Sequence, residues 1–255
     1  MLKHILDAHG GKLPDDVHVV FANTGKEMPQ TLEFVAECGE RWGVKITWLE
    51  YDSEAEDKTR EVTFSTASRN GEPFASLIRY VKYPPNPVAR VCTFHLKVRR
   101  FEKFMARLGI EEWNSVIGLR ADEPRRVAKQ RRRNDTGGDR FFTTMPMAAA
   151  GATKEIVNEW WESQEFNLRL ANIGGVTPAG NCDLCFLKGK DTLVSLLREK
   201  PELATWWIEQ ERALGKTFRI DRPSYAELRE EAERAERTEM AFTFAEGTMP
   251  CMCTD

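Results

Sequence analysis

Apolar and polar positions in the first part of the chain follow the pattern of a parallel α/β sheet. Residues 17–21 form a short, almost continuous apolar run bounded by turn residues, as is typical of a buried parallel strand. Residues 29–42 carry apolar side chains at helical spacing, and residues 45–51 predict the next strand. A strand, a helix and a strand in this order imply a right-handed crossover. We therefore predict the α/β fold class, with a Rossmann-like parallel sheet flanked by helices.

The later pattern predicts short elements and then a helical C-terminal region. A strand is expected at residues 115–119, a mobile loop at 129–141, and little regular structure at 52–90. Helices are expected at residues 1–10, 97–108, 154–171, 191–200, 202–214 and from Ser224, which forms a capping box with Glu227. The expected organisation is a nucleotide-binding domain (1–150), a helical region (151–242) and a cysteine-bearing tail (243–255).

Composition narrows the class of protein. No apolar run approaches the ~18 residues that would span a bilayer. The first residues carry a charge within their apolar part and no cleavage site, so we expect a cytoplasmic protein and no membrane partner. Six cysteines in a cytosolic chain favour metal binding or catalysis over disulfides, because that compartment keeps thiols reduced.

Charge is uneven although the formal net charge is only -3. Residues 125–133 are strongly basic, and a run of this kind is most often a solvated or flexible face. The alternative is that the run meets nucleic-acid phosphates. Trp160 and Trp161 are adjacent on a predicted helix and cannot both face the core, so one of them is a candidate for covering a ligand or a partner.

Five cysteines gather in three segments that together could hold a metal. Their positions are Cys92, the C-x-x-C pair Cys182 and Cys185, and the tail pair Cys251 and Cys253. C-x-x-C spacing lets two thiolates bind one metal or one cluster corner, so the ligand set Cys92, Cys182, Cys185 and Cys251 is chemically complete. Zinc usually shows two close pairs, whereas a four-iron cluster is more often assembled from scattered cysteines. Ordinary buried thiols remain the simplest interpretation of Cys38.

The remaining tail thiol has two interpretations. If one tail cysteine is a ligand, then the other, Cys253 or Cys251, is a candidate nucleophile whose pKa nearby cations would lower. The alternative is a disordered end whose thiols do nothing. Lys97 could neutralise the cluster or contact a substrate anion, and His95 is expected to be a surface or packing residue.

Candidate nucleotide contacts follow two predicted strands, because ligands of open parallel sheets bind at the carboxyl ends of strands. They are Asn23, Thr24 and Gly25 after one strand, and Arg120, Arg125 and Arg126 after another. The amide and hydroxyl can hydrogen-bond a nucleotide, the glycine permits close approach, and the arginines offer planar forks for phosphate or sulfate. Asn-Thr-Gly could equally be only a turn.

Four motifs together resemble the phosphoadenosine phosphosulfate (PAPS) reductase family of the adenine nucleotide alpha-hydrolase-like superfamily. They are VVFANTGKEMPQTLEFV, NPVARVCTFHLK, GLRADEPRR and GNCDLCFLK, and the pattern is most similar to reductase-like proteins of phages and bacteria. The resemblance implies an adenine nucleotide held by Asn23–Gly25 and Arg120. It also implies a [4Fe–4S] cluster at Cys92, Cys182 and Cys185, with Lys97 beside it.

The chain departs from the family in three places. The Ser-Gly-Gly-x-x-Ser phosphate loop is absent, and Met1 lies where the helix after that loop is expected, so we expect a truncation or an internal start. Thr93 follows Cys92 where the family usually has adjacent cysteines, so the fourth ligand is expected from the tail. The family's C-terminal Glu-Cys-Gly-Leu-His-type motif is also missing, which leaves Cys251 or Cys253 as its substitute.

These observations leave three hypotheses for function. The first is an iron-sulfur enzyme that reduces an adenylylated sulfur compound or transfers its sulfur, served by a thiol reductant. The second is an ATP-dependent protein that thiolates nucleic acid, and the third is a non-catalytic, metal-containing accessory protein. A homo-oligomer is compatible with each of them.

Overall fold

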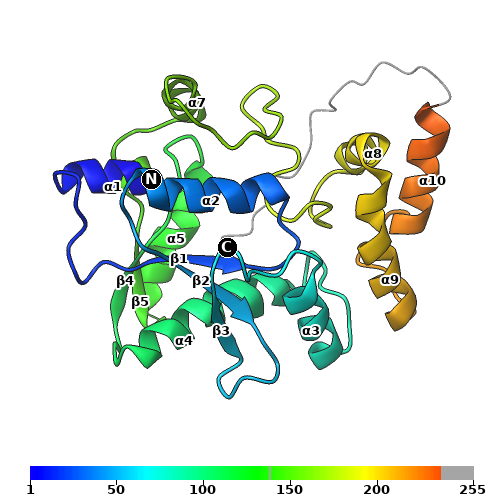
Figure 1. Ribbon diagram of the computed structural model, residues 1–255, viewed down its shortest axis with the longest axis horizontal. Coiled ribbons are helices and arrows are strands. Elements are labelled where there is room, and N and C mark those ends of the chain that lie inside the picture. The colour runs from blue at the N-terminus through cyan, green and yellow to red at the C-terminus, as the bar shows by residue number, and fades with distance from the viewer. Residues whose placement is uncertain (138, 237–255) are drawn as a thin grey trace.

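The computed structural model of the chain describes residues 1–137 and 139–236 (Figure 1). Its strands are β1 (Val19–Asn23), β2 (Ile46–Tyr51), β3 (Thr59–Val62), β4 (Trp113–Val116) and β5 (Phe141–Thr144). In the first half the helices are α1 (Leu2–Ala8), α2 (Pro29–Arg41), α3 (Glu72–Val81), the π-helix η1 (Thr93–Val98) and α4 (Arg99–Arg107). Then follow α5 (Pro124–Thr136), α6 (Pro146–Ala149), α7 (Lys154–Glu162), α8 (Lys190–Glu199), the 3-10 helix η2 (Pro201–Leu203), α9 (Ala204–Leu214) and α10 (Tyr225–Glu236).

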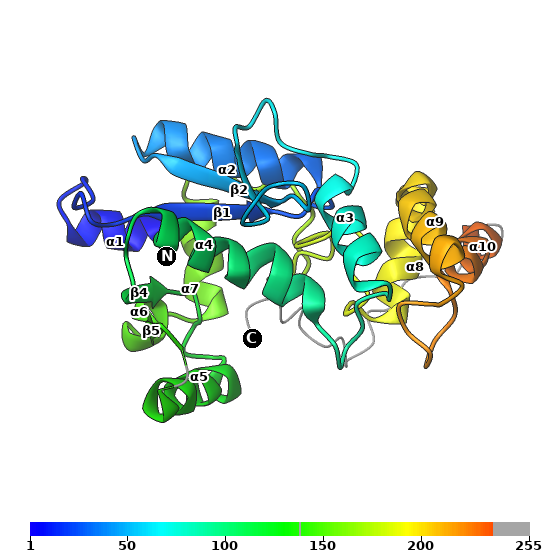
Figure 2. The same ribbon diagram turned by 90° about the horizontal axis from the view of Figure 1, so that it is seen from below.

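The first sheet contains the predicted strand–helix–strand unit. β1 and β2 pair in parallel, with Val19 opposite Ile46 and Asn23 opposite Glu50. Helix α2 covers one face of this sheet and α4 covers the other (Figure 2). The alternation of β2 explains both layers, because Trp48 packs with Leu32 of α2 and Leu49 packs with residues of α4. β3 was not predicted, and it adds to β2 as an antiparallel edge.

The second sheet pairs β4 and β5 in parallel, with α5 as the crossover between them. In the described part of the chain these strands form a sheet of their own, so the predicted single Rossmann-like sheet is only partly present. The prediction of a mobile loop at 129–141 is wrong. Arginine, lysine, glutamine and alanine all favour helix, and α5 buries Val127 and Gln130 against β5. The Gln130 amide donates to Thr143 Oγ1 at 2.8 Å.

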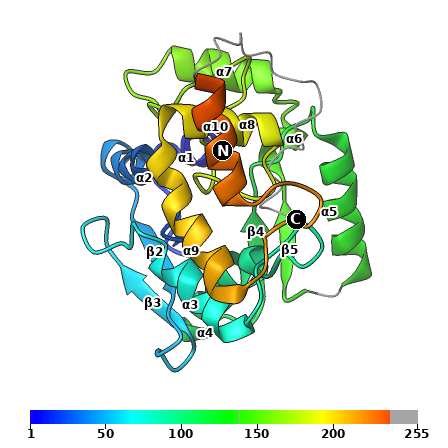
Figure 3. The same cartoon turned by 90° about the vertical axis from the view of Figure 1, so that its right-hand side faces the viewer.

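The C-terminal helices complete the core that is most relevant to the site. α8, α9 and α10 lie together at one end of the molecule (Figure 3). Fully buried Trp207, Phe218 and Tyr225 join a cluster that also contains Phe74 of α3 and both C-x-x-C thiols. The C-terminal helices therefore pack directly against the segment that carries the cysteines.

Several helix ends are those that the sequence predicts. Ser224 Oγ donates to Glu227 at 2.7 Å and accepts from the Glu227 amide at 3.3 Å, which confirms the capping box. Thr153 accepts from the Ile156 amide and caps α7, but α7 ends at Glu162, well before residue 171. Residues 52–90, expected to be irregular, contain β3 and α3. No helix within residues 1–137 and 139–236 is long and apolar enough to cross a membrane.

Candidate functional site

Asn23 ends β1 and fixes the shape of the loop that follows. Its Nδ2 donates to Glu50 Oε1 at 2.7 Å and to the Ser68 carbonyl at 2.8 Å, and its Oδ1 accepts from the Gly25 amide at 3.1 Å. Asn23 and Glu50 are both fully buried. Glu50 also accepts from Ser68 and forms a 2.8 Å ion pair with Arg60, so its charge is compensated. The Asn23 amide group is therefore engaged within the protein and organises the loop.

Gly25 is required by a close contact between two backbone segments. Its φ is +76°, and a Cβ at this position would lie 3.0 Å from the Gly71 nitrogen and 3.0 Å from Pro73 Cδ. The Gly71 amide donates to the Gly25 carbonyl at 2.8 Å. Gly71 begins α3 with φ +81°, and its own Cβ would meet the Trp206 indole at 2.5 Å. The loop is consequently held against the start of α3 and against α9.

Thr24 and Glu27 form a buried polar pair on this loop. The Thr24 hydroxyl lies 2.9 Å from both Glu27 carboxyl oxygens, and the Thr24 amide donates to Glu27 Oε2 at 3.0 Å. Burial raises the pKa of Glu27, while the nearby Lys97 charge and the Thr24 hydrogen bonds act in the opposite direction. Lys97 comes from η1, which contacts β1, and its charge acts on Glu27 from there.

The C-x-x-C segment joins the same loop directly. Glu27 and Cys182 form an isolated antiparallel bridge, and the Asp183 amide donates to the Lys26 carbonyl at 2.7 Å. Thr24 Oγ1 lies 3.5 Å from Cys182 Sγ. The loop after β1 and the C-x-x-C segment, which lie far apart in the sequence, are thus joined by hydrogen bonds into one unit.

A buried ion pair locks this junction. Lys26 Nζ lies 2.8 Å from Asp183 Oδ2, and both side chains are less than 10% exposed. Asp183 Oδ1 accepts from the Trp207 indole at 2.8 Å, and Lys26 lies over the Trp206 ring with its Nζ 5.1 Å from the ring centroid. Each charge therefore has several partners, as buried charges require.

The turn between the two C-x-x-C thiols is held by side chains from later in the sequence. Buried Lys188 donates to the carbonyls of Gly180 and Cys182, at 2.6 and 2.8 Å. The Tyr225 hydroxyl donates to the Leu184 carbonyl at 2.6 Å, and burial raises the pKa of this tyrosine. Cys182 and Cys185 are both buried, and the segment presents a well-fixed pair of thiols.

Cys92 approaches the same region from the start of η1. It packs, partly buried, against the hydrophobic cluster that includes Cys182 and Cys185. η1 is a π-helix, a form that is rare and often found at functional sites. Its residues Thr93 and Leu96 are buried, and burial lowers the pKa of His95, as suits its expected packing role.

The predicted metal site requires several of these side chains to converge on one point. Among residues 1–137 and 139–236, no group of three or more histidine, cysteine, aspartate or glutamate side chains is arranged to hold a metal ion. The fourth expected ligand, Cys251, and the candidate nucleophile Cys253 lie outside the described residues. The described side chains alone therefore do not supply the ligand set of a four-iron cluster.

The arginine loop belongs to the second sheet. Arg120 follows β4 and pairs with Asp122 at 2.9 Å and with Glu123 at 3.5 Å. Arg126 pairs with Glu123, and Arg125 is exposed on the first turn of α5. The Ala121 amide donates to the Ala152 carbonyl at 2.8 Å, which ties this loop to the start of α7. The contacts described for Arg120 are with its own loop, so its role toward a nucleotide stays a prediction.

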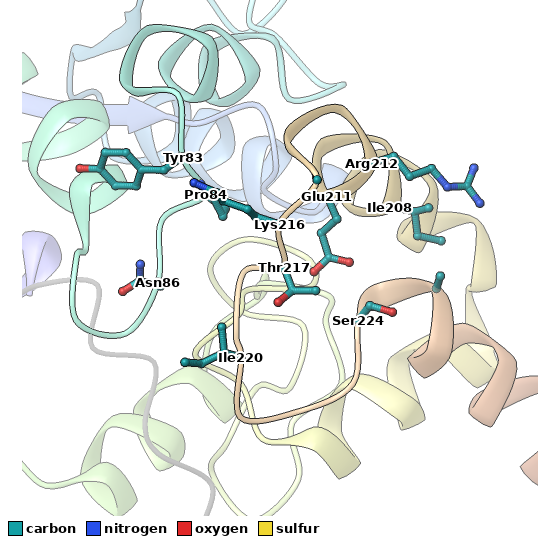
Figure 4. Close-up of a pocket in the computed structure, with 12 residues that line it drawn as sticks. Tyr83, Pro84, Asn86, Ile208, Glu211, Arg212, Lys216, Thr217, Ile220 and Ser224 are labelled. Atoms are coloured by element: carbon teal, nitrogen blue, oxygen red, sulfur yellow. The ribbon is translucent and has the colours of Figure 1, made fainter.

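A cavity of about 680 Å³ opens between the segment that leads to Cys92 and the C-terminal helices (Figure 4). Tyr83 and Pro84 lie on one side, and Glu211 and Thr217 face it from the other. Glu211 accepts from the amides of Phe218 and Tyr225, at 3.1 and 2.9 Å. Its carboxylate is therefore occupied in joining α9 to α10, and this cavity is separate from the Thr24–Cys182 junction.

Comparison with known proteins settles the family. A family model described as the phosphoadenosine phosphosulfate reductase domain matches residues 10–162, more than half of the chain. The chain belongs to this family. A relative in Escherichia phage lambda, an uncharacterized nin region protein called ORF290, is 29% identical over 182 residues. That alignment covers 68% of this chain and only 57% of the phage protein's length. No solved structure matches the chain significantly.

The sequence predicted Thr24, Lys97 and the C-x-x-C thiols as candidates, but it did not single out the buried charged residues around them. Lys26, Glu27 and Asp183 lie within the recognised motifs, and each is a charged residue that the fold buries. A charged residue next to a buried strand end was the available signal, because such a residue needs a partner of opposite charge or a hydrogen-bond donor.

Proposed function

We propose that the chain binds an adenylylated sulfur compound at the carboxyl end of β1 and reduces it or transfers its sulfur group. The observation that carries the proposal is the junction of the Asn23–Glu27 loop with the C-x-x-C segment, within a chain of the PAPS reductase domain family. Strand ends of open α/β sheets are the usual place for nucleotides. Thiols fixed beside such a loop suit chemistry on sulfur.

Lys97 is the proposed contact for the substrate anion. Its charge acts on buried Glu27, and η1 contacts β1, which supports a Lys97 side chain within reach of the strand-end loop. Burial raises the pKa of Glu27 and the Lys97 charge lowers it, so the two groups interact, and a bound sulfate or phosphate would join the same local charge arrangement. Arg120, Arg125 and Arg126 are proposed to meet phosphate oxygens as the sequence predicts.

A thiolate of Cys253 or Cys251 is the proposed nucleophile. It attacks the sulfur of the sulfonate group, a sulfur–sulfur bond forms, and the sulfur–oxygen bond to the nucleotide phosphate breaks. The nucleotide leaves with that electron pair. A second thiolate, from a reductant, then attacks the cysteine sulfur, so that a disulfide forms and sulfite departs with the electron pair. The two thiols are oxidised and the sulfonate sulfur is reduced by two electrons.

The iron-sulfur cluster is a separate part of the proposal. When bound, a [4Fe–4S] cluster would add a local charge centre, and its reduction potential would depend on nearby hydrogen bonds and on exposure to solvent. The proposed ligands are Cys92, Cys182, Cys185 and Cys251. Because the described residues do not complete this set, no step above depends on the cluster.

Nucleotide binding tests the proposal. Adenosine 3′,5′-bisphosphate and AMP, the nucleotides that leave from a substrate with or without a 3′-phosphate, are titrated calorimetrically into the wild-type chain, Lys97→Met and Lys45→Met. Lys45 is exposed, so its variant controls for the loss of one charge. We expect binding by the wild type, about tenfold weaker binding by Lys97→Met, and no change for Lys45→Met, since a factor of ten corresponds to about 1.4 kcal/mol. Absence of binding by the wild type would overturn the proposal, and equal binding by Lys97→Met would remove Lys97 from it.

A further inference from the structure

An aromatic pocket lies away from the thiol junction, between α1, the end of α2, and α6–α7. Its volume is about 320 Å³. The walls include Trp42, Trp160 and Trp161, with Met147 and Ile156 between them and His4 on the α1 side. Volumes of this order suit a small ligand or one ring system of a larger one. The strand-end loop and the C-x-x-C residues do not line it.

The three indoles of this pocket have different structural roles. Trp161 is packed between Phe34 and Phe166, with ring centroids 5.1 and 5.7 Å away, and it stacks on Trp42 at 6.2 Å. Trp160 contacts Trp161 edge to face at 4.6 Å. Trp161 is thus the residue that packs inward. Trp160 is the one whose ring is left to cover a ligand, and the flat apolar walls favour a planar aromatic ring.

Helix α5 carries a basic face beside this pocket. Val127, Gln130 and Asn134 face the sheet, and Arg125, Lys129 and Arg132 lie on the opposite, exposed side at helical spacing. Arg125 and Arg132 form no ion pair with any residue in the described ranges. By contrast, Arg126 pairs with Glu123 and Arg133 pairs with Asp139.

The pocket and the basic face belong to adjoining elements. The loop that begins α5 is bonded to the pocket wall through the Ala121 amide and the carbonyl of pocket-lining Ala152, at 2.8 Å. The Lys154 amide at the start of α7 donates to Asp122 Oδ2 at 3.3 Å. Figure 2 shows α5 at the edge of the molecule, on the side of α6 and α7 and away from α8–α10, and Figure 3 shows one end of α5 near α6.

We propose that this pocket and the outward face of α5 form one binding surface for single-stranded nucleic acid. One base enters the pocket and stacks against Trp160, and the phosphates follow Arg125, Lys129 and Arg132. Aromatic platforms beside a basic track are the common means of binding single strands without sequence preference. Arg132 lies seven residues after Arg125, so the helix rises about 10 Å between them and holds the three cations in a row that successive phosphates of one strand can follow.

Two other polyanions fit these observations less well. Membrane binding usually uses clusters of about four to eight lysines and arginines, more than this face presents. An acidic peptide would pair with the arginines, but its carboxylates would gain nothing from a pocket lined by three indole rings. Binding of nucleic acid does not depend on the sulfur chemistry proposed above, and of its residues only Arg125 also belongs to that proposal.

Fluorescence anisotropy of a labelled twelve-nucleotide oligothymidylate, measured over a range of salt concentrations, tests the proposal. With about 0.7 ions released per phosphate contact, three contacts predict a slope of log K against log salt near −2 for the wild-type chain. The double variant Arg125→Ala/Arg132→Ala should make the slope shallower by about 1.4, because two phosphate contacts are lost. The matched control Lys45→Ala/Arg79→Ala removes two exposed charges elsewhere, and it should keep the wild-type slope.

Trp160 variants separate base stacking from charge. Trp160→Ala should weaken binding about 5- to 150-fold, the range of one stacked base, with the slope unchanged, and Trp160→Phe should restore most of the affinity. An oligonucleotide of abasic sites should bind the wild type as weakly as oligothymidylate binds Trp160→Ala, and this comparison holds even if Trp160→Ala folds poorly. Absence of oligonucleotide binding by the wild type would overturn the proposal. So would polyglutamate binding as tightly as oligothymidylate while Trp160→Ala has no effect.

Discussion

The Lys26 ammonium and the Asp183 carboxylate lie 2.8 Å apart in the interior, one on the loop after β1 and the other between the two C-x-x-C cysteines. Replacing one partner leaves the other as an unpaired buried charge. We therefore expect Asp183→Asn or Lys26→Met to lower the free energy of unfolding by about 3–5 kcal/mol. Urea denaturation measures this change in the free energy of unfolding. Glu231→Ala breaks the more exposed Lys190–Glu231 pair, and it should cost at most about 1 kcal/mol.

Thr24 supplies the hydroxyl that satisfies buried Glu27. Thr24→Val keeps the shape of the side chain but removes this donor, so we expect a loss of about 1–3 kcal/mol in unfolding free energy. Thr24→Ser retains the hydroxyl and should recover most of that loss. Equal stability of the valine and serine variants in denaturant titrations would contradict the role given to this hydrogen bond.

Gly25 and Gly43 form a matched pair for the backbone argument. Both have positive φ, +76° and +62°, so alanine at either position incurs about 1–2 kcal/mol of strain. Only at Gly25 would the new Cβ also meet backbone, 3.0 Å from the Gly71 nitrogen, whereas Gly43 has nothing within 4 Å. Gly25→Ala should therefore be less stable than Gly43→Ala by about 1–3 kcal/mol in thermal or chemical unfolding.

Burial of Glu211 makes stability depend on pH. Burial raises the pKa of this carboxyl above its ordinary value of 4.5, so the folded state holds its proton more tightly than the unfolded state does. The contribution of Glu211 to the free energy of unfolding is then greatest below the pKa that this carboxyl has in the unfolded state. It falls as pH rises through the raised pKa of the folded state. Glu211→Gln should flatten the decline of unfolding free energy measured from pH 4 upward. A decline as steep as that of the wild type would show that other groups cause it.

Metal analysis tests the cysteine prediction. Protein purified without oxygen should contain about four irons and four sulfides per chain if the cluster forms. Cys185→Ser should lose this iron, and Cys38→Ser should keep it, because Cys38 lies buried on α2, outside the C-x-x-C cluster. Zinc alone in the wild type would favour a structural site, and absence of both metals in folded protein would contradict the ligand set.

Local patterns predicted well those elements whose neighbours in sequence are also neighbours in space. The β1–α2–β2 unit and the Ser224–Glu227 capping box follow from short-range apolar spacing and from capping chemistry. α3 was missed although Phe74, Leu77 and Ile78 have helical spacing and are buried. Gly71 before this helix and the proline-rich segment 84–87 after it obscured the helical pattern.

The candidate site shows the limit of the same reasoning. Motifs predicted Thr24, Cys182 and Lys97 as candidate site residues, but the bridge between Glu27 and Cys182 arises from tertiary packing, which no local pattern reports. α5 illustrates the opposite error, since its basic charge indicated a loop while its buried face, with Val127 and Gln130, makes it a helix. Net charge describes the exposed side of a helix and says little about whether the helix forms.

Thr24 and Cys182 are 158 residues apart in the sequence, and yet they touch. During synthesis, a ribosome delivers the strand-end loop early and the thiol segment only after most of the chain has emerged. Until then Lys26 lacks Asp183, the partner that permits its burial, so we expect this part of the nascent loop to stay solvated. Contacts of such long sequence separation form slowly. We therefore expect this junction to assemble late in folding, and a half-synthesised chain presents neither the thiols nor a finished strand-end loop.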